Sequence, residues 1–171
     1  MKDKSKYHSE PKSDEALHNQ FMQKAVALSR EHMEKGHGGP FGAVIVKDGK
    51  IISEGWNQVT STNDPTAHAE VQAIRKACDY LKSFDLKGAV IYTSCEPCPM
   101  CLSAIYWARI EKIYYANTRE DAANIAFDDE FIYQEIGRSI SQRTIPMLQL
   151  KCSEAGQVFE DWITKHDKIR Y

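Results

Sequence analysis

Three cysteines fall within seven residues in the stretch CEPCPMC, residues 95–101. Cys98 and Cys101 have the Cys-x-x-Cys spacing, which is compatible with a disulfide, a thioredoxin-like redox pair or half of a metal site. The chain contains five cysteines, an odd number, so complete internal pairing is impossible. Disulfide frameworks are typical of small secreted chains, whereas 171 residues can bury a full-sized core. We therefore expect a reducing compartment, which leaves the redox pair and the metal site.

A histidine and a glutamate lie upstream in DPTAHAEV, with His68 30 positions before Cys98. One His and two Cys make a three-ligand zinc site, which leaves a fourth position for water, as in catalytic zinc sites. A structural zinc site would need a further ligand pair, and outside CEPCPMC the sequence has no other Cys-x-x-Cys or His-x-x-x-His. Glu70 would then suit proton transfer, although a helix dipole alone can also explain a glutamate there. The spacing predicts a hydrolytic zinc site, with a redox pair as its rival.

Both ligand segments are expected where helices begin. The start signal DPT precedes a helix whose apolar face is marked by Val71, Ile74, Cys78 and Leu81. AVIYTS (89–94) is expected to be a buried strand that runs into the cluster, and LSAIYWAR a helix that follows it. Two helix N-termini can thus converge on one ion and favour its thiolate ligands. Cys95 still belongs to the strand end, so we expect it outside the coordination sphere.

The remaining elements predict an α/β fold. We expect an amphipathic helix from Glu15 to Gly36, and a hairpin of GAVIV and IISEGW joined at Asp48-Gly49. Further elements are a strand KIYYAN (112–117), a helix near 130–136, a strand MLQLKC and a helix near 157–166. This alternation predicts a three-layer α/β/α sandwich around a mixed sheet of about five strands. We expect one domain over residues 16–171, after a disordered polar extension over residues 1–15.

Charge and hydropathy restrict the possible partners. A formal net charge of -2 and a pI near 6.3 provide no basic footprint for a phosphate backbone, which disfavours a nucleic-acid substrate. No apolar run approaches the roughly 20 residues that span a bilayer. The polar start MKDKSKYHSEPKSDE has no secretory apolar segment. We expect a cytoplasmic protein with a small-molecule substrate.

The motif HAE followed by PCPMC resembles the H-x-E…P-C-x-x-C signature of the cytidine deaminase superfamily. GGPFGAVIVKDG, NDPTAHAEV, AIRKAC, YTSCEPCPMC, AIYWAR and AFDDEFIY resemble the bacterial guanine deaminases in particular. The resemblance implies a cytidine deaminase-like fold and the hydrolysis of guanine to xanthine and ammonia, with one zinc ion per active site. It implies that the ligands are His68, Cys98 and Cys101, and that Glu70 is the general acid/base.

The same resemblance implies the substrate contacts. Phe41 would stack on the base, Asn57 would hydrogen-bond the purine, and the backbone of Ala69 would lie between ligand and acid. Asp129 and Tyr171 would close over the guanine and recognise it. From residue types alone, these four side chains would be a core residue, a turn residue, a helix start and a chain end. The resemblance also implies a homodimer, with an exchanged C-terminal segment that brings Tyr171 to the partner's site.

Other functions stay open at this point. Guanosine deaminases share many of these sequence motifs, whereas FDDEFIY and RTIP favour an enzyme that acts on the free base guanine. Editing of tRNA adenosine is disfavoured by the acidic balance, and a noncatalytic zinc or redox module could be built on Cys98 and Cys101. The extension before residue 15 and the tail HDKIRY depart from the family pattern.

Overall fold

The computed structural model describes residues 12–171, with side chains from residue 15 onward. Most of the expected extension, residues 1–11, lies outside the described residues. Two compact units form, one ending at Asp128 and one over Asp129–Tyr171. The first contains α1 (Lys12–Glu34), β1 (Gly42–Lys47), β2 (Lys50–Trp56), α2 (Val59–Thr62), α3 (Ala69–Leu81), β3 (Ala89–Cys95), α4 (Pro99–Trp107), β4 (Lys112–Asn117) and α5 (Arg119–Asn124).

The sheet of the first unit has the strand order β2-β1-β3-β4. β1 pairs antiparallel with both β2 and β3, and β3 pairs parallel with β4, so the sheet is mixed as expected. The described residues form four strands rather than about five, because MLQLKC is not a strand. Asp48 (φ 51°) and Gly49 (φ 72°) both adopt the left-handed conformation that a tight hairpin requires, which confirms the predicted turn.

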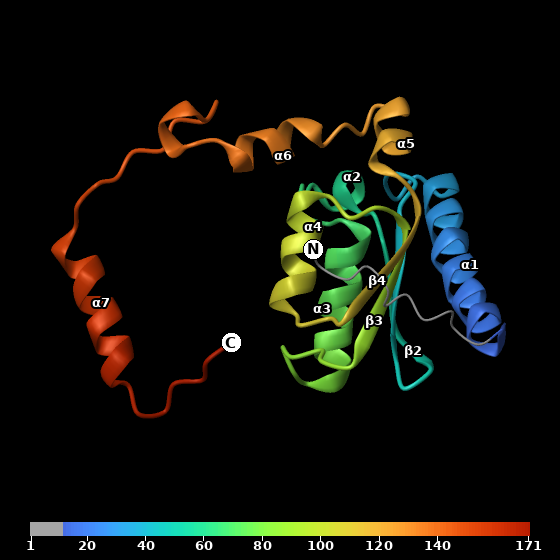
Figure 1. Cartoon of the computed structure of the whole chain (residues 1–171), viewed down its shortest axis with the longest axis horizontal. Helices are drawn as coiled ribbons and strands as arrows, with labels where there is room; N and C mark the ends of the chain where they lie inside the picture. The colour runs from blue at the N-terminus through green and yellow to red at the C-terminus, as the bar shows by residue number, and fades with distance from the viewer. Residues whose placement is uncertain (1–11) are drawn as a thin grey trace, which may run out of the picture. The chain divides into compact units, whose positions relative to one another are not determined.

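Helices cover both faces of this sheet (Figure 1), which confirms the three-layer α/β/α architecture. Side chains alternate along β1: Val44 and Val46 pack towards Phe21 and Leu28 of α1. Ala43 and Ile45 join the opposite cluster, which contains the alanines of α3. The sheet is therefore buried on both sides, which explains the continuous apolar strand sequences.

α3 lies unusually close to β2. The buried stripe of α3 is Ala69, Ala73 and Ala77, whereas the expected face of larger residues is only partly buried. Gly55 of β2 makes this approach possible: a Cβ on it would lie 2.1 Å from the Ala69 carbonyl oxygen and 2.6 Å from the Ala73 nitrogen. Small residues on both elements thus fix where the N-terminus of α3 lies.

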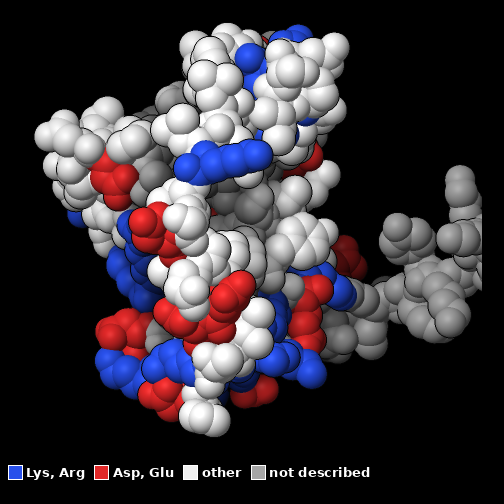
Figure 2. Space-filling model, turned by 90° about the vertical axis from the view of Figure 1, so that its left-hand side faces the viewer, with Lys and Arg blue, Asp and Glu red and all other residues white. Residues whose placement is uncertain are grey.

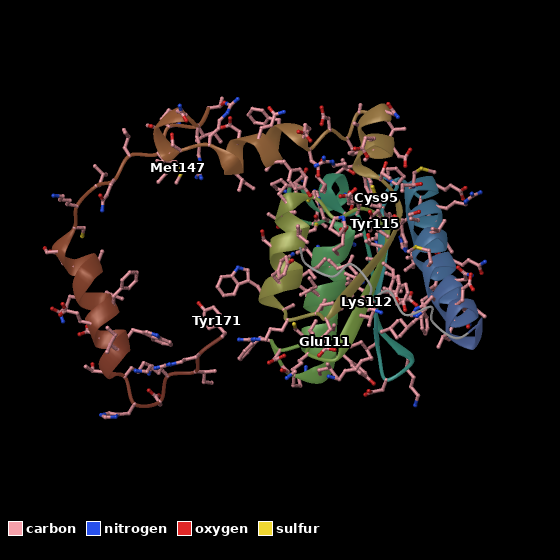
Figure 3. The ribbon with its side chains drawn as sticks, viewed as in Figure 1. Cys95, Glu111, Lys112, Tyr115, Met147 and Tyr171 are labelled. Carbon is pink, nitrogen blue, oxygen red and sulfur yellow. The ribbon has the colours of Figure 1, made fainter. Side chains whose placement is uncertain are left out.

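The loops that carry the predicted site residues of the first unit meet at one edge of the sheet, where β1 begins and β2 and β3 end. Because β1 runs antiparallel to both β2 and β3, Gly42 at the start of β1 pairs with Trp56 at the end of β2, and Ala43 pairs with Thr93 near the end of β3. Figure 3 shows Cys95 and Tyr115 towards this edge and Glu111 with Lys112 at the other end of β4. Ligand sites of α/β proteins form beyond such strand ends.

The second unit contains α6 (Glu130–Gly137), a 3-10 turn (Ile140–Gln142) and α7 (Ser153–Thr164). The first helix agrees with the expected one, and α7 begins four residues earlier than the expected helix near 157–166. None of these elements has a buried residue, and apolar side chains such as Phe159 and Ile163 are exposed. No described helix is both long and apolar enough to cross a membrane.

Candidate metal centre and active site

Three potential metal ligands converge at the sheet edge. His68 Nδ1 lies 3.6 Å from Cys98 Sγ and 3.5 Å from Cys101 Sγ, and one ligand atom of each residue lies within 4.8 Å of the others. Cys101 is buried, and His68 and Cys98 are partly buried. Among the described residues, these three form the group of His, Cys, Asp or Glu side chains that could hold a metal ion.

Two helix N-termini place these ligands. His68 is the N-cap residue of α3, and Cys98 is the N-cap residue of α4, with Pro99 at the first helical position. Neither N-cap side chain makes a capping hydrogen bond, so both remain available as ligands. Cys101 follows on the first turn of α4, and α3 packs against α4. The predicted convergence of two helix starts is thus what the structure shows.

The donor set and spacing fit zinc. Zn–S bonds of about 2.3 Å and Zn–N bonds of about 2.0–2.1 Å, at tetrahedral angles, place N and S about 3.5 Å apart. The two N···S distances of 3.6 and 3.5 Å agree with that edge length. Hydrogen bonds from Cys101, the largest cause, and from His68 lower the pKa of the Cys98 thiol to about 4. The same hydrogen bond between the two cysteines raises the pKa of the Cys101 thiol, and both thiols must become thiolates to bind zinc.

Glu70 lies on the first turn of α3 and is only 6% exposed. One carboxylate oxygen, Oε1, accepts a hydrogen bond of 3.0 Å from the Thr93 hydroxyl. Burial is the largest cause of its raised pKa, because desolvation disfavours the charged form. A buried acid two residues after a metal ligand can both accept and return a proton.

Phe41 and Asn57 belong to loops at the same edge and are joined by hydrogen bonds. The Asn57 backbone N–H donates to the Phe41 carbonyl at 3.0 Å. The buried Asn57 side chain accepts through Oδ1 from the backbone N–H groups of Gly39 at 3.1 Å and Val59 at 3.2 Å. Because both neighbours are donors, Oδ1 faces them and the Nδ2 amino group points elsewhere.

Cys95 lies outside the metal-ligand group, as expected, and its buried thiol donates to the Thr118 carbonyl at 3.5 Å. Ala69 is fully buried beside Gly55. Asp129 and Tyr171 lie in the second unit, Asp129 as the N-cap of α6 and Tyr171 with 73% exposure. Their assignment to the site stays a prediction.

Two residues escaped the sequence analysis. Phe127 packs edge-on against Phe41, with ring centroids 4.9 Å apart, and Thr93 bonds Glu70. Phe127 directly precedes Asp128-Asp129, so its position in the sequence was a weak indication that it lies near the site. Thr93 is a β-branched residue in a buried strand, as is common, so nothing in the sequence indicated that it contacts Glu70.

Comparison with known proteins agrees with this geometry. Residues 15–117 match the cytidine and deoxycytidylate deaminase zinc-binding region. The chain is 54% identical to guanine deaminase of Bacillus subtilis over 154 residues, which cover 90% of this chain and 99% of that protein. The crystal structure of a Bacillus subtilis guanine deaminase matches with a TM-score of 0.88 over 90% of this chain and 98% of that one. The tRNA-specific adenosine deaminase of Aquifex aeolicus is 44% identical over 96 residues, 56% of this chain and 63% of that protein. The chain therefore belongs to the cytidine and deoxycytidylate deaminase family and carries that family's zinc-binding region.

Proposed function

We propose that this protein hydrolyses guanine to xanthine and ammonia with one zinc ion per active site. The observation that carries the proposal is the buried Glu70 beside the three ligands, in a chain that is 54% identical to a guanine deaminase over 90% of its length. Similarity to the tRNA-specific adenosine deaminase of Aquifex aeolicus covers only 56% of the chain. On the face that Figure 2 shows, acidic and basic side chains are interspersed, and this face offers no basic patch for a phosphate backbone.

Proton transfer is the task of Glu70 in this proposal. His68, Cys98 and Cys101 would hold the zinc ion, which would lower the pKa of water towards about 7 and so supply a nucleophile at neutral pH. Glu70 would accept one proton of that water and deliver it to the ring nitrogen beside carbon 2. It would then take the proton of the new hydroxyl on carbon 2, which becomes the carbonyl, and pass it to the amino group, which departs as ammonia. One carboxylate thus serves as base and acid, and its burial excludes competing water.

Base recognition is assigned to Phe41, Asn57 and the backbone of Ala69. The Phe41 ring would stack on the purine, and Phe127 supports that ring from its edge. Asn57 uses its oxygen for Gly39 and Val59, so only its Nδ2 donors remain for the substrate. The Nδ2 donors can hydrogen-bond the carbonyl oxygen on carbon 6 of guanine. Adenine has an amino group at that carbon, which is itself a donor. Asp129 would accept from the amino and ring N–H donors of guanine.

The second unit belongs to the same deaminase domain, residues 16–171, in this proposal. Similarity to the curated guanine deaminase covers 99% of that protein, which includes the counterpart of this unit. Because α6 and α7 bury none of their residues, their apolar side chains need a partner surface. A homodimer with exchanged C-terminal segments would provide one and bring Tyr171 to a partner's site. We place this enzyme of purine catabolism in the cytoplasm.

Ammonia release from equal concentrations of guanine, guanosine, adenine and cytosine tests the proposal. We expect guanine to have the highest kcat/KM, since Asn57 offers a donor to its carbonyl. Faster turnover of guanosine would replace the substrate assignment with the nucleoside, and no ammonia from any of the four by the zinc-loaded protein would refute the proposed activity. Sedimentation analysis of the full chain tests the dimer, which a monomer would refute.

A further inference from the structure

Thr93 places a hydroxyl on the largely apolar face of the sheet that packs against α3, where Ser53 of β2 provides another. It is 1% exposed, and its Oγ1 donates to Glu70 Oε1 at 3.0 Å. Ile91, two residues earlier on the same face of β3, is fully buried in the aliphatic cluster with Ile45. The hydroxyl is thus a polar group in an apolar layer.

Packing alone does not require this hydroxyl. Valine has nearly the same shape as threonine, and it is equally suited to a buried strand. A buried hydroxyl costs free energy unless it has a hydrogen-bond partner, and that partner here is the carboxylate of Glu70, 23 residues away in the sequence. The polar choice at this position is therefore explained by Glu70 and not by the core.

The two partners differ in rigidity. Thr93 is β-branched and held by both neighbouring strands, opposite Ala43 of β1 and Tyr115 of β4. Glu70 has a longer side chain, whose carboxylate could adopt several orientations. A hydroxyl fixed in the sheet restricts that freedom by holding one carboxylate oxygen, in addition to the hydrogen bond between the carboxylate and Cys101.

We propose that Thr93 is a positioning residue for the reaction: its hydroxyl holds Oε1 of Glu70 so that Oε2 faces the reacting atoms. This inference rests on the proposed function, in which Glu70 transfers the protons. Thr93 itself does not touch the substrate. The hydrogen bond contributes orientation, which is worth most in the transition state, so its loss should lower kcat and leave KM nearly unchanged.

A matched control exists on β2. Ser53 is 7% exposed, and its hydroxyl donates to the Ala73 carbonyl of α3 at 2.8 Å. It joins strand to helix as Thr93 does, but its acceptor is a backbone carbonyl oxygen one turn further along α3 and not the carboxylate of Glu70. Ser53→Ala therefore reports what a lost hydroxyl between strand and α3 does to folding alone.

The experiment compares Thr93→Val, Thr93→Ser and Ser53→Ala in the zinc-loaded enzyme, by kcat, KM, zinc content and Tm. We expect kcat of Thr93→Val to fall by about 10- to 100-fold with zinc content and KM unchanged. Thr93→Ser should restore kcat to within about threefold, because it keeps the donor. Ser53→Ala should lower Tm and leave kcat unchanged.

Three results would overturn the inference: a Thr93→Val kcat within about twofold of wild type, a Thr93→Ser variant as slow as Thr93→Val, or a kcat loss that follows zinc loss. A crystal structure of Thr93→Val tests the same point without substrate. Its Glu70 carboxylate should leave the wild-type orientation, and an unmoved carboxylate would contradict the positioning role. A displaced Glu70 in a protein that never deaminates guanine would refute the proposed function but support the positioning role.

Discussion

Replacing Gly55 by alanine tests whether the approach of α3 to β2 sets the geometry of the site. The new Cβ would lie 2.1 Å from the Ala69 carbonyl oxygen, whereas such contacts are essentially never closer than 3.0 Å. The first turn of α3 must therefore retreat by at least 0.9 Å, the difference between these distances. That turn carries Glu70 and directly follows His68, so both groups would move with it.

The size of the effect follows from this displacement. A misplacement of about 1 Å in a catalytic constellation costs about 100-fold in rate. Overpacking also costs about 1–3 kcal/mol of stability, which in a protein of this size lowers Tm by about 2–12 °C. We expect Gly55→Ala to fold, to melt earlier and to lose about 100-fold in kcat on guanine.

Gly88→Ala is the control that separates a loss of protein stability from a change in the geometry of the site. Gly88 has φ +82°, directly before the start of β3 and at the opposite end from Cys95, and a Cβ there would meet only Lys47 Nζ at 3.7 Å. Alanine would be strained by about 1–2 kcal/mol. Ammonia release and thermal unfolding of both variants are the assays. If Gly55→Ala and Gly88→Ala lose similar stability and both keep kcat within about threefold, Gly55 does not set the site.

Three further results are expected. Glu70→Gln should keep its zinc and lose about 10²- to 10⁴-fold in kcat; zinc loss measured by atomic absorption, or kcat near wild type, would contradict the role of Glu70. Removing zinc with a chelator, or by Cys98→Ser, should abolish ammonia release and lower Tm; an unchanged Tm would contradict metal binding by this residue. Burial is the largest cause of the lowered pKa of His32. The positive charges of His37, Lys35 and Lys76 lower it further, and the negative charge of Glu31 opposes them. The unfolded chain thus binds this proton more readily, so the free energy of unfolding should fall as pH decreases below about 6.5. In urea titrations His32→Gln should reduce this pH dependence of the free energy of unfolding. A variant with the same pH profile as the wild type would refute the role of His32.

Local interactions explain which elements could be predicted from the sequence. The hairpin depends on Asp48-Gly49, and both residues have the expected positive φ. The ligand segments were predictable because N-cap positions and the Cys-x-x-Cys spacing are local patterns. The buried face of α3 was not predicted, because small alanines are buried there by the close approach of Gly55, which belongs to a distant strand.

Long-range contacts explain what the sequence could not reveal. Thr93 and Glu70 are 23 residues apart, and their hydrogen bond depends on how α3 lies over the sheet. MLQLKC alternates like a strand, yet Leu148 and Leu150 are 87% and 90% exposed, and no strand forms there within the second unit. Strand formation requires a pairing edge, and sequence periodicity does not indicate whether one is available.

The separation of the metal ligands along the chain has a consequence for folding. His68 and Cys98 are 30 residues apart, so an ion that joins them closes a long loop. In a zinc finger the metal would have to meet that entropic cost. Here β3, which lies within the loop, is already paired with β1 and β4, so the sheet brings the ligands together. We therefore expect metal capture to be a late folding step, and the chelated chain to keep its secondary structure at room temperature.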